Sequence, residues 1–392
     1  MDKNKGDVYM NKKEVTEIKK QFTPSNCAIT RICGCYVDGE KEKIAYLKEA
    51  FLSLPEEEMF KYFDIFRKAL SGTIGKNLLN MEFPISAESE GGTQEFLLKL
   101  RNSQLTDEDL LEEFYNRVID SYDYGENYLI LLVHAVYDIP GKSSDGMEMF
   151  DASDEVYDYI HCVICPVKLS KPGLSYHAAE NSFHERIRDW IVEMPAAGFL
   201  FPAFNDRSTD IHNVLYYSKN AEKLSNGLTD LLLGCVTPLS AGSQKDTFRF
   251  LIEETLGEDC DYDTVKNIHS NLNELLEQNA ENPDPLELDK AEVKYLLAKS
   301  GVKEEKMESF DQQFEAAAGN NTTLLATNIA STKTFEIKTA EVSIKVSPEF
   351  ADLIETRLID GRKCLVIGVD DSVEINGISA KTVTAQTDFG AQ

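Results

Sequence analysis

Two apolar runs separated by a short polar segment form the clearest pattern in the middle of the chain. Residues 198–204 are mostly apolar or aromatic, residues 205–210 are polar, and residues 211–217 are again rich in apolar and aromatic side chains. Strand-forming runs on both sides of a short polar connector are typical of a β-hairpin. The pattern therefore predicts a rigid hairpin over residues 198–217 whose connector carries several ionisable side chains.

The segments before this hairpin alternate between strand and helix patterns. Residues 128–139 and 156–168 are apolar on both faces, as expected for central strands of a sheet. Residues 28–37 predict a further strand, and residues 178–192 predict a helix that leads into the hairpin. Together these elements indicate a mixed or antiparallel β-sheet with flanking helices.

The pattern becomes helical after residue 221 and returns to strands near the C-terminus. The predicted helices of this middle segment are 221–233, 245–256, 263–278, 286–299 and 303–318. The last segment predicts strands at 334–346, 363–369 and 373–378 and a helix at 348–359. We therefore predict an α+β fold in three parts: a sheet domain over 1–220, a helical segment over 221–320, and a small β-β-α-β-β domain over 330–382.

The net charge of the chain makes some classes of binding partner less favourable than others. The chain has 392 residues and a formal net charge of −28, with no basic stripe to offset it. Such a charge disfavours nucleic acids and anionic membranes. The first residues lack the apolar core of a signal peptide, and the longest apolar run, residues 128–136, is too short to span a bilayer. We expect a cytoplasmic protein whose eight cysteines are thiols.

The hairpin connector supplies the first candidate site. It contains Asn205, Asp206, Arg207, Asp210 and His212. The two aspartates and the histidine have the chemistry for acid–base catalysis, and Arg207 with Asn205 has the chemistry to bind an anionic substrate. The alternative is structural: Asx turns and an Asp–Arg ion pair that hold the loop together. The sequence favours the structural interpretation.

Two histidines on the predicted central strands form a second, weaker candidate site. If residues 139 and 156 close one hairpin loop, His134 lies opposite His161. Neighbouring imidazoles are typical of a metal or proton-relay site, and the alternative is two core histidines bonded to tyrosines or backbone carbonyls. A register slip of one residue would move one histidine to the other face. No cofactor and no metal is predicted beyond this weak pair.

Two further patterns resemble metal motifs but have unsuitable spacing. Cys162 and Cys165 point to opposite faces of a strand, so we predict buried thiols there. His177, Glu180 and His184 lie on one face of the predicted helix. Along a helix the two histidines would be separated by about 10 Å, at a rise of ~1.5 Å per residue, so one metal would not reach both.

Three segments resemble a known family. They are NKKEVTEIKKQFTPSNCAITRICGCYV (residues 11–37), GFLFPAFNDRSTDIHNVLYY (residues 198–217) and SPEFADLIETRLIDGRKCLVIGV (residues 347–369). They are similar to an uncharacterised family of bacterial proteins classed as a domain of unknown function. The resemblance covers roughly residues 11–378 and implies a bacterial cytoplasmic protein. It assigns no catalytic residues.

Two functional hypotheses from different classes follow. The first is a cytoplasmic protein-binding or scaffolding protein without catalytic activity, whose acidic surface contacts a protein partner. The second is a hydrolase with Asp206, Asp210 and His212 in acid–base roles and Arg207 as the anion anchor. We favour the first because the sequence contains no complete catalytic signature. The oligomeric state does not follow from the sequence.

Overall fold

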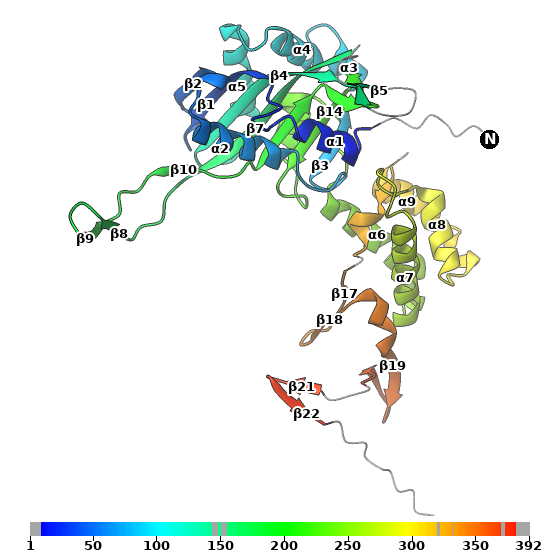
Figure 1. Ribbon diagram of the computed structural model, residues 1–392. Helices are drawn as coiled ribbons and strands as arrows, with labels where there is room; N and C mark the ends of the chain where they lie inside the picture. Colours follow the sequence, from blue (N-terminus) through cyan, green and yellow to red (C-terminus); the bar gives the residue numbers. More distant parts are fainter. Residues whose placement is uncertain are drawn as a thin grey trace, which may run out of the picture. The chain divides into compact units, whose positions relative to one another are not determined.

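The computed structural model describes residues 9–142, 148–149, 155–319, 322–331, 333–369 and 373–381. The chain forms two compact units (Figure 1). The first comprises Met1–Lys245 with Asn282–Pro285, and the second comprises Asp246–Glu281 with Leu286–Gln392. Helices occur beside a large antiparallel sheet, so the predicted α+β class is confirmed. The predicted three-part division stays a prediction.

An antiparallel sheet forms the centre of the first unit. Its strands are β1 (Ile29–Val37), β2 (Lys43–Ala50), β3 (Leu78–Glu82), β4 (Tyr128–Ile139), β7 (Glu155–Leu169), β10 (Trp190–Val192), β11 (Ala197–Phe201) and β14 (Asn213–Ser218). Within the described residues the order is β2-β1-β4-β7-β11-β14-β3, and β10 also pairs with β7. Strands β4 and β7 therefore lie in the interior of the sheet.

Helices pack on both faces of this sheet. One face carries α1 (Lys12–Lys19) and α2 (Glu56–Ala69), and the other carries α4 (Thr93–Asn102), α5 (Glu108–Ser121) and the π-helix η2 (Gly227–Leu233). Leu131 of β4 belongs to the core under α2, whereas the next residue, Leu132, belongs to the core under α5. Successive side chains of a strand point to opposite faces. A strand between two helical layers therefore buries apolar residues on both faces, as the sequence predicted for β4 and β7.

The predicted hairpin over residues 198–217 is confirmed. Strand β11 pairs with β14, with Gly198 opposite Tyr217. Between them, β12 (Ala203–Asn205) pairs with β13 (Ser208–Asp210). The remaining short elements of this unit are η1 (Phe51–Ser53), α3 (Ile85–Glu88), β5 (Gly141–Lys142) and β6 (Glu148–Met149).

The predicted helix over residues 178–192 is wrong. The chain instead forms β8 (Leu174–His177) and β9 (Ser182–Glu185), and then β10. Asn181 has a positive φ of 47°, which ends any helical path and lets the chain reverse. Apolar and polar residues alternate along β8, as a strand requires.

The second unit contains most of the predicted middle helices. The segment comprises α6 (Ala241–Leu256), η3 (Gly257–Asp259), α7 (Tyr262–Gln278), β15 (Glu287–Leu288), α8 (Lys290–Lys299), η4 (Glu304–Met307), α9 (Phe310–Ala318), β16 (Leu324–Leu325) and α10 (Ala326–Ile329). Asp261 and Asp289 cap the starts of α7 and α8. Leu272 of α7 and Leu296 of α8 are fully buried.

The C-terminal segment differs from its prediction at the expected helix 348–359 and at the expected strand 373–378, which is a hairpin of two short strands. The segment contains β17 (Phe335–Lys338), β18 (Ser343–Val346), η5 (Pro348–Leu353), β19 (Ile354–Ile359), β20 (Arg362–Ile367), β21 (Val373–Ile375) and β22 (Ile378–Ala380). The predicted helix 348–359 is therefore a single 3₁₀ segment followed by a strand. The β-branched residues of β19 and the turn at Asp360, which has a positive φ of 50°, favour a hairpin with β20.

Candidate functional site

The connector of the central hairpin is a tight two-residue turn. Asp206 and Arg207 have positive φ values of 49° and 56° and join β12 to β13. Two successive residues in this conformation match the twist of an antiparallel hairpin. Asn205 is buried, and Asp206 is exposed at the turn.

Asp210 acts as a local brace in this connector. Its Oδ2 accepts hydrogen bonds from Nδ2 of Asn205 at 2.5 Å and from Nδ2 of Asn213 at 2.7 Å. Its Oδ1 accepts the backbone N–H of His212 at 2.9 Å. Both carboxylate oxygens are thus occupied by neighbouring residues, as in an Asx turn.

His212 and Arg207 contact different elements. The Nδ1 atom of His212 lies 2.5 Å from Oε1 of Glu88, and this hydrogen bond raises the pKa of His212 despite its partial burial. The Nη2 atom of Arg207 donates to the carbonyl of Pro140 at 3.1 Å and pairs with Oε1 of Glu17 at 3.2 Å. The structure therefore brings Asn205 and Asp210 together but directs His212 and Arg207 to separate partners. The hydrolase roles stay a prediction.

The predicted register of the two histidines is wrong by one residue. His134 pairs with Ile160, and His161 pairs with Val133. His134 contacts Oδ1 of Asp158 at 2.7 Å, whereas His161 lies on the other face, with ring nitrogens 2.9 Å from the Phe199 carbonyl and 3.3 Å from the Phe66 carbonyl. The slip separates the imidazoles, so they share no metal.

The cysteines match the sequence prediction. Cys162 and Cys165 belong to the two cores on opposite faces of the sheet, and all eight cysteines are free thiols. Burial raises the pKa of the Cys165 thiol to about 12. Among the residues that the structure describes, no group of three or more His, Cys, Asp or Glu side chains could hold a metal ion.

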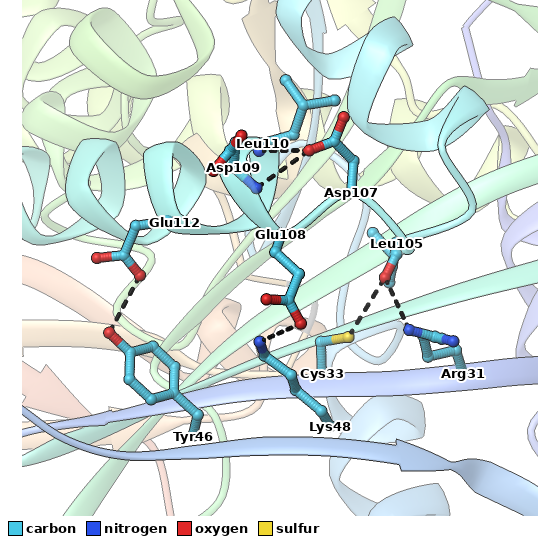
Figure 2. Close-up of polar contacts among 10 residues, drawn as sticks. All are labelled: Arg31, Cys33, Tyr46, Lys48, Leu105, Asp107, Glu108, Asp109, Leu110 and Glu112. Atoms are coloured by element: carbon cyan, nitrogen blue, oxygen red, sulfur yellow. Dashed lines mark hydrogen bonds and ion pairs between the residues drawn. The ribbon is translucent and has the colours of Figure 1, made fainter.

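A small surface pocket lies between β2 and α5, and no sequence pattern predicted it. Figure 2 shows polar contacts of several of its lining residues. The pocket volume is about 320 Å³, and its lining consists of Tyr46, Lys48, Glu108, Asp109, Leu111, Glu112 and Tyr115. The hydroxyl of Tyr46 donates to Oε2 of Glu112 at 3.0 Å, and Nζ of Lys48 lies 2.9 Å from Oε1 of Glu108. These two side-chain pairs link the edge strand β2 to α5. Their role is best explained as structural, and the pocket is the space left between the two elements.

The most unusual feature of the first unit is an extended two-stranded arm, which we define as residues 170–189 (Figure 1). It begins where β7 pairs with β10, continues through a hydrogen bond from the Ser170 amide to the Asp189 carbonyl at 2.8 Å, and ends in the β8–β9 hairpin. All of these pairs keep one unbroken register. The arm therefore consists of an irregular stem, residues 170–173 and 186–189, joined by backbone hydrogen bonds at Ser170–Asp189 and Gly173–Arg186, and a paired β8–β9 hairpin at its tip.

The two faces of the arm differ in character. Leu174, Tyr176 and Phe183 lie on one face of the β8–β9 hairpin and are 75%, 54% and 68% exposed, and Glu185, opposite Leu174, shares this face. Ile187, two residues beyond Glu185, continues the alternation and is 78% exposed. The rings of Tyr176 and Phe183 are 5.4 Å apart across the ribbon. The opposite face carries polar residues: Lys171, Ser175, His177, Ser182, His184, Arg186 and Arg188.

The arm also differs from the rest of the chain in charge. It contains three basic residues, Lys171, Arg186 and Arg188, and three acidic residues, Glu180, Glu185 and Asp189, so its formal charge is zero on a chain of −28. Sequence reasoning missed the arm because its apolar residues were assigned to a helix. The period-two alternation on both sides of residues 178–181 was the signal that could have revealed it.

These features define the class of the protein as an α+β protein with helices on both faces of an antiparallel sheet and a projecting arm that ends in a β-hairpin. The model of the family described as Domain of unknown function (DUF4317) matches residues 10–378, and the chain belongs to this family. No curated protein matches the chain. In the described part of the chain, no helix combines the length and apolar character needed to cross a membrane.

Proposed function

We propose that the protein is a non-catalytic binding protein that docks onto another protein through the apolar face of the arm. The observation that carries this proposal is a projecting arm with four exposed large apolar side chains, three of them on one face of the paired β8–β9 hairpin beside Glu185. Apolar side chains that cluster on the exposed surface of a folded protein often mark a site where another protein binds.

Burial of this apolar face would contribute a free energy comparable to the cost of association. Fully burying an apolar side chain of this size contributes about 1.5–3 kcal/mol, so four contribute roughly 6–12 kcal/mol. Association costs about 4–15 kcal/mol in lost motion. The apolar face therefore offsets a large part of that cost, and because the hairpin backbone is already paired, little further ordering is needed.

Charge favours a partner of a different kind over a second copy of this chain. Two copies would each bring a formal charge of −28, whereas the arm itself is neutral. The partner that fits is a protein with an apolar groove for the arm and a basic rim that faces the acidic body. We place this interaction in the bacterial cytoplasm, where the eight free thiols would stay reduced.

Site-specific photo-crosslinking tests this proposal. A photoreactive amino acid replaces Phe183 on the arm or, as a matched control, Ile85, which is 88% exposed on the body of the same unit. We expect one discrete adduct with a different protein from the Phe183 position and none from Ile85. The adduct protein is then purified, and its affinity is measured with Phe183→Asp, which should weaken binding at least about tenfold by removing a buried aromatic contact.

Three outcomes would contradict the proposal. One is an adduct only between copies of this chain. Another is equal labelling from both positions, which indicates nonspecific contact. The third is an unchanged affinity of the purified partner for Phe183→Asp.

A further inference from the structure

The outer edge of strand β2 is open. Within the described residues β2 pairs with β1 alone, so its opposite edge has no neighbouring strand. Ile44 and Tyr46 of this strand are 55% and 49% exposed. An unpaired edge presents a row of backbone N–H and C=O groups, and folded proteins usually protect such an edge, often with lysine side chains.

The two lysines of β2 do not protect its edge, because both are held by helix α5. Lys43 pairs with Glu112, and Nζ of Lys48 lies 2.9 Å from Oε1 of Glu108 (Figure 2). These ion pairs draw the lysine side chains over the face of the sheet. The backbone edge of β2 is therefore accessible to an extended chain.

The pocket between β2 and α5 lies beside this edge. Its lining includes Tyr46 and Lys48, which are two residues apart and share one face of β2. A strand added next to β2 would place alternate side chains on that same face, next to the pocket. The volume of about 320 Å³ is at the small end of the range for binding pockets, so it suits one side chain.

The charge of the pocket favours a cationic side chain. Its lining contains three carboxylates, of Glu108, Asp109 and Glu112, and one ammonium group, of Lys48, so its formal charge is −2. Glu108 and Glu112 already have lysine partners. The carboxylate of Asp109 makes no ion pair or hydrogen bond within the described residues, so it remains available to an incoming lysine or arginine.

We propose that the open edge of β2 binds an extended basic segment of another protein by β-strand addition, with a lysine or arginine of that segment in the pocket. In this mode of recognition main-chain hydrogen bonds supply affinity and pockets for alternate side chains supply specificity. The net charge of −28 attracts a basic segment and disfavours a second copy of this chain. This surface uses no residue of the arm and goes beyond the proposed function.

Titration of labelled synthetic peptides with the full-length chain tests this surface. Fluorescence anisotropy of fluorescein-TVKVKVKT should show saturable binding. The peptide TVEVEVET should bind at least about tenfold more weakly, because its carboxylates would meet those of the pocket. The first peptide with all central amide nitrogens methylated should not bind, because it lacks the N–H donors that pair with a strand edge.

Protein variants and hydrogen exchange locate the binding surface. Asp109→Asn should weaken binding of TVKVKVKT at least about threefold. Glu57→Gln is the matched control, because Glu57 also lies in the first turn of a helix, α2, but does not line the pocket; its affinity should stay within twofold. Phe183→Asp should bind the peptide as wild type does, so a failure of the arm proposal would leave this result unchanged. The peptide should slow amide exchange in residues 43–50 and leave the other edge strand, β3, unchanged.

Several results would overturn the proposal. They are equal binding of the lysine and glutamate peptides, binding of the methylated peptide, and protection of β3 instead of β2. Absence of saturable binding up to about 1 mM peptide would also overturn it. So would a wild-type dimer in sedimentation whose residues 43–50 are protected without peptide, because a second copy would then occupy the edge.

Discussion

At the scale of single residues, His161 is a polar side chain that is fully buried in the hydrophobic core. Its imidazole lies within 5.6 Å of the rings of Phe22 and Phe66, on the face of the sheet covered by α1 and α2. A neutral imidazole has one N–H, which one of the two nearby carbonyls can accept. Burial lowers the pKa of His161 to about 4, although both carbonyls favour the charged form. The residue therefore acts as a neutral core side chain.

This lowered pKa predicts a loss of stability in acid. The unfolded chain takes up the proton near pH 6.5, and the folded chain does so only near its pKa of about 4. The free energy of unfolding should therefore fall as pH decreases from 6.5 to 4, by up to about 3 kcal/mol from this residue. Chemical denaturation across this range measures it.

The variant that tests this is His161→Leu. The slope of the free energy of unfolding against pH between 6.5 and 4 should be flatter in His161→Leu than in wild type. Equal slopes for wild type and His161→Leu would show that His161 titrates normally in the fold.

At the scale of elements, the hairpin β11–β14 depends on close backbone approach to β7. A Cβ added at Gly198 would lie 2.6 Å from the backbone oxygen of Cys162 and 3.3 Å from Cα of Val163. Real Cβ atoms do not come within 2.6 Å of a neighbouring atom, and both of these neighbours belong to the backbone of β7, which cannot rotate away as a side chain does. Glycine is therefore required at the position where β11 enters the sheet.

Gly198→Ala should lower the free energy of unfolding by about 1–3 kcal/mol, because the added methyl group forces the two strands apart. Gly173→Ala is the matched control, since a Cβ there meets no atom within 4 Å. It should change stability by less than about 0.5 kcal/mol. Urea denaturation of both variants gives the comparison, and equal effects would contradict the close contact.

The sequence predicted helices and strands well where apolar residues recur with a regular period. Residues 128–139 form β4, which is buried at most positions on both faces, and α7 followed from its helical period. The register between β4 and β7 was predicted one residue out, because loop closure was assumed at Val156 instead of Glu155. Periodicity does not specify where a loop closes.

The sequence predicted where the connector of the hairpin lies, but it did not predict which residues its side chains contact. The sequence placed a polar hairpin connector at residues 205–210, which the structure closes with a two-residue turn at Asp206 and Arg207, and the structural interpretation included Asx chemistry, which Asp210 shows. The partners of His212 and Arg207 are Glu88 and Glu17, residues distant in sequence that only the tertiary fold brings close. The arm was missed because exposed apolar residues fit a helical pattern as readily as a ribbon.

At the scale of the whole molecule, the arm is separate from both hydrophobic cores of the sheet unit. Within the described residues, neither core contains any side chain from 171 to 188. Regions that bury little apolar surface contribute little to global stability. The arm is therefore an addition to the folded unit that serves a purpose other than stability.

Removal of the arm should leave the fold intact. In the deletion variant, Asn-Gly replaces residues 171–188 and closes a hairpin on the Ser170–Asp189 pair. The thermal unfolding midpoint should stay within about 3 °C of wild type, because no core contact is lost. Circular dichroism during heating measures it. A drop of more than about 10 °C, or loss of a cooperative transition, would show that the arm supports the sheet.

The single register that connects β7 to the tip of the arm restricts how the arm can change in length. An insertion of one residue in one strand would rotate every later side chain to the opposite face and present histidines where the apolar residues now lie. Matched insertions of two residues in both strands would preserve the two surfaces. Length changes within this family should therefore come in even, paired steps.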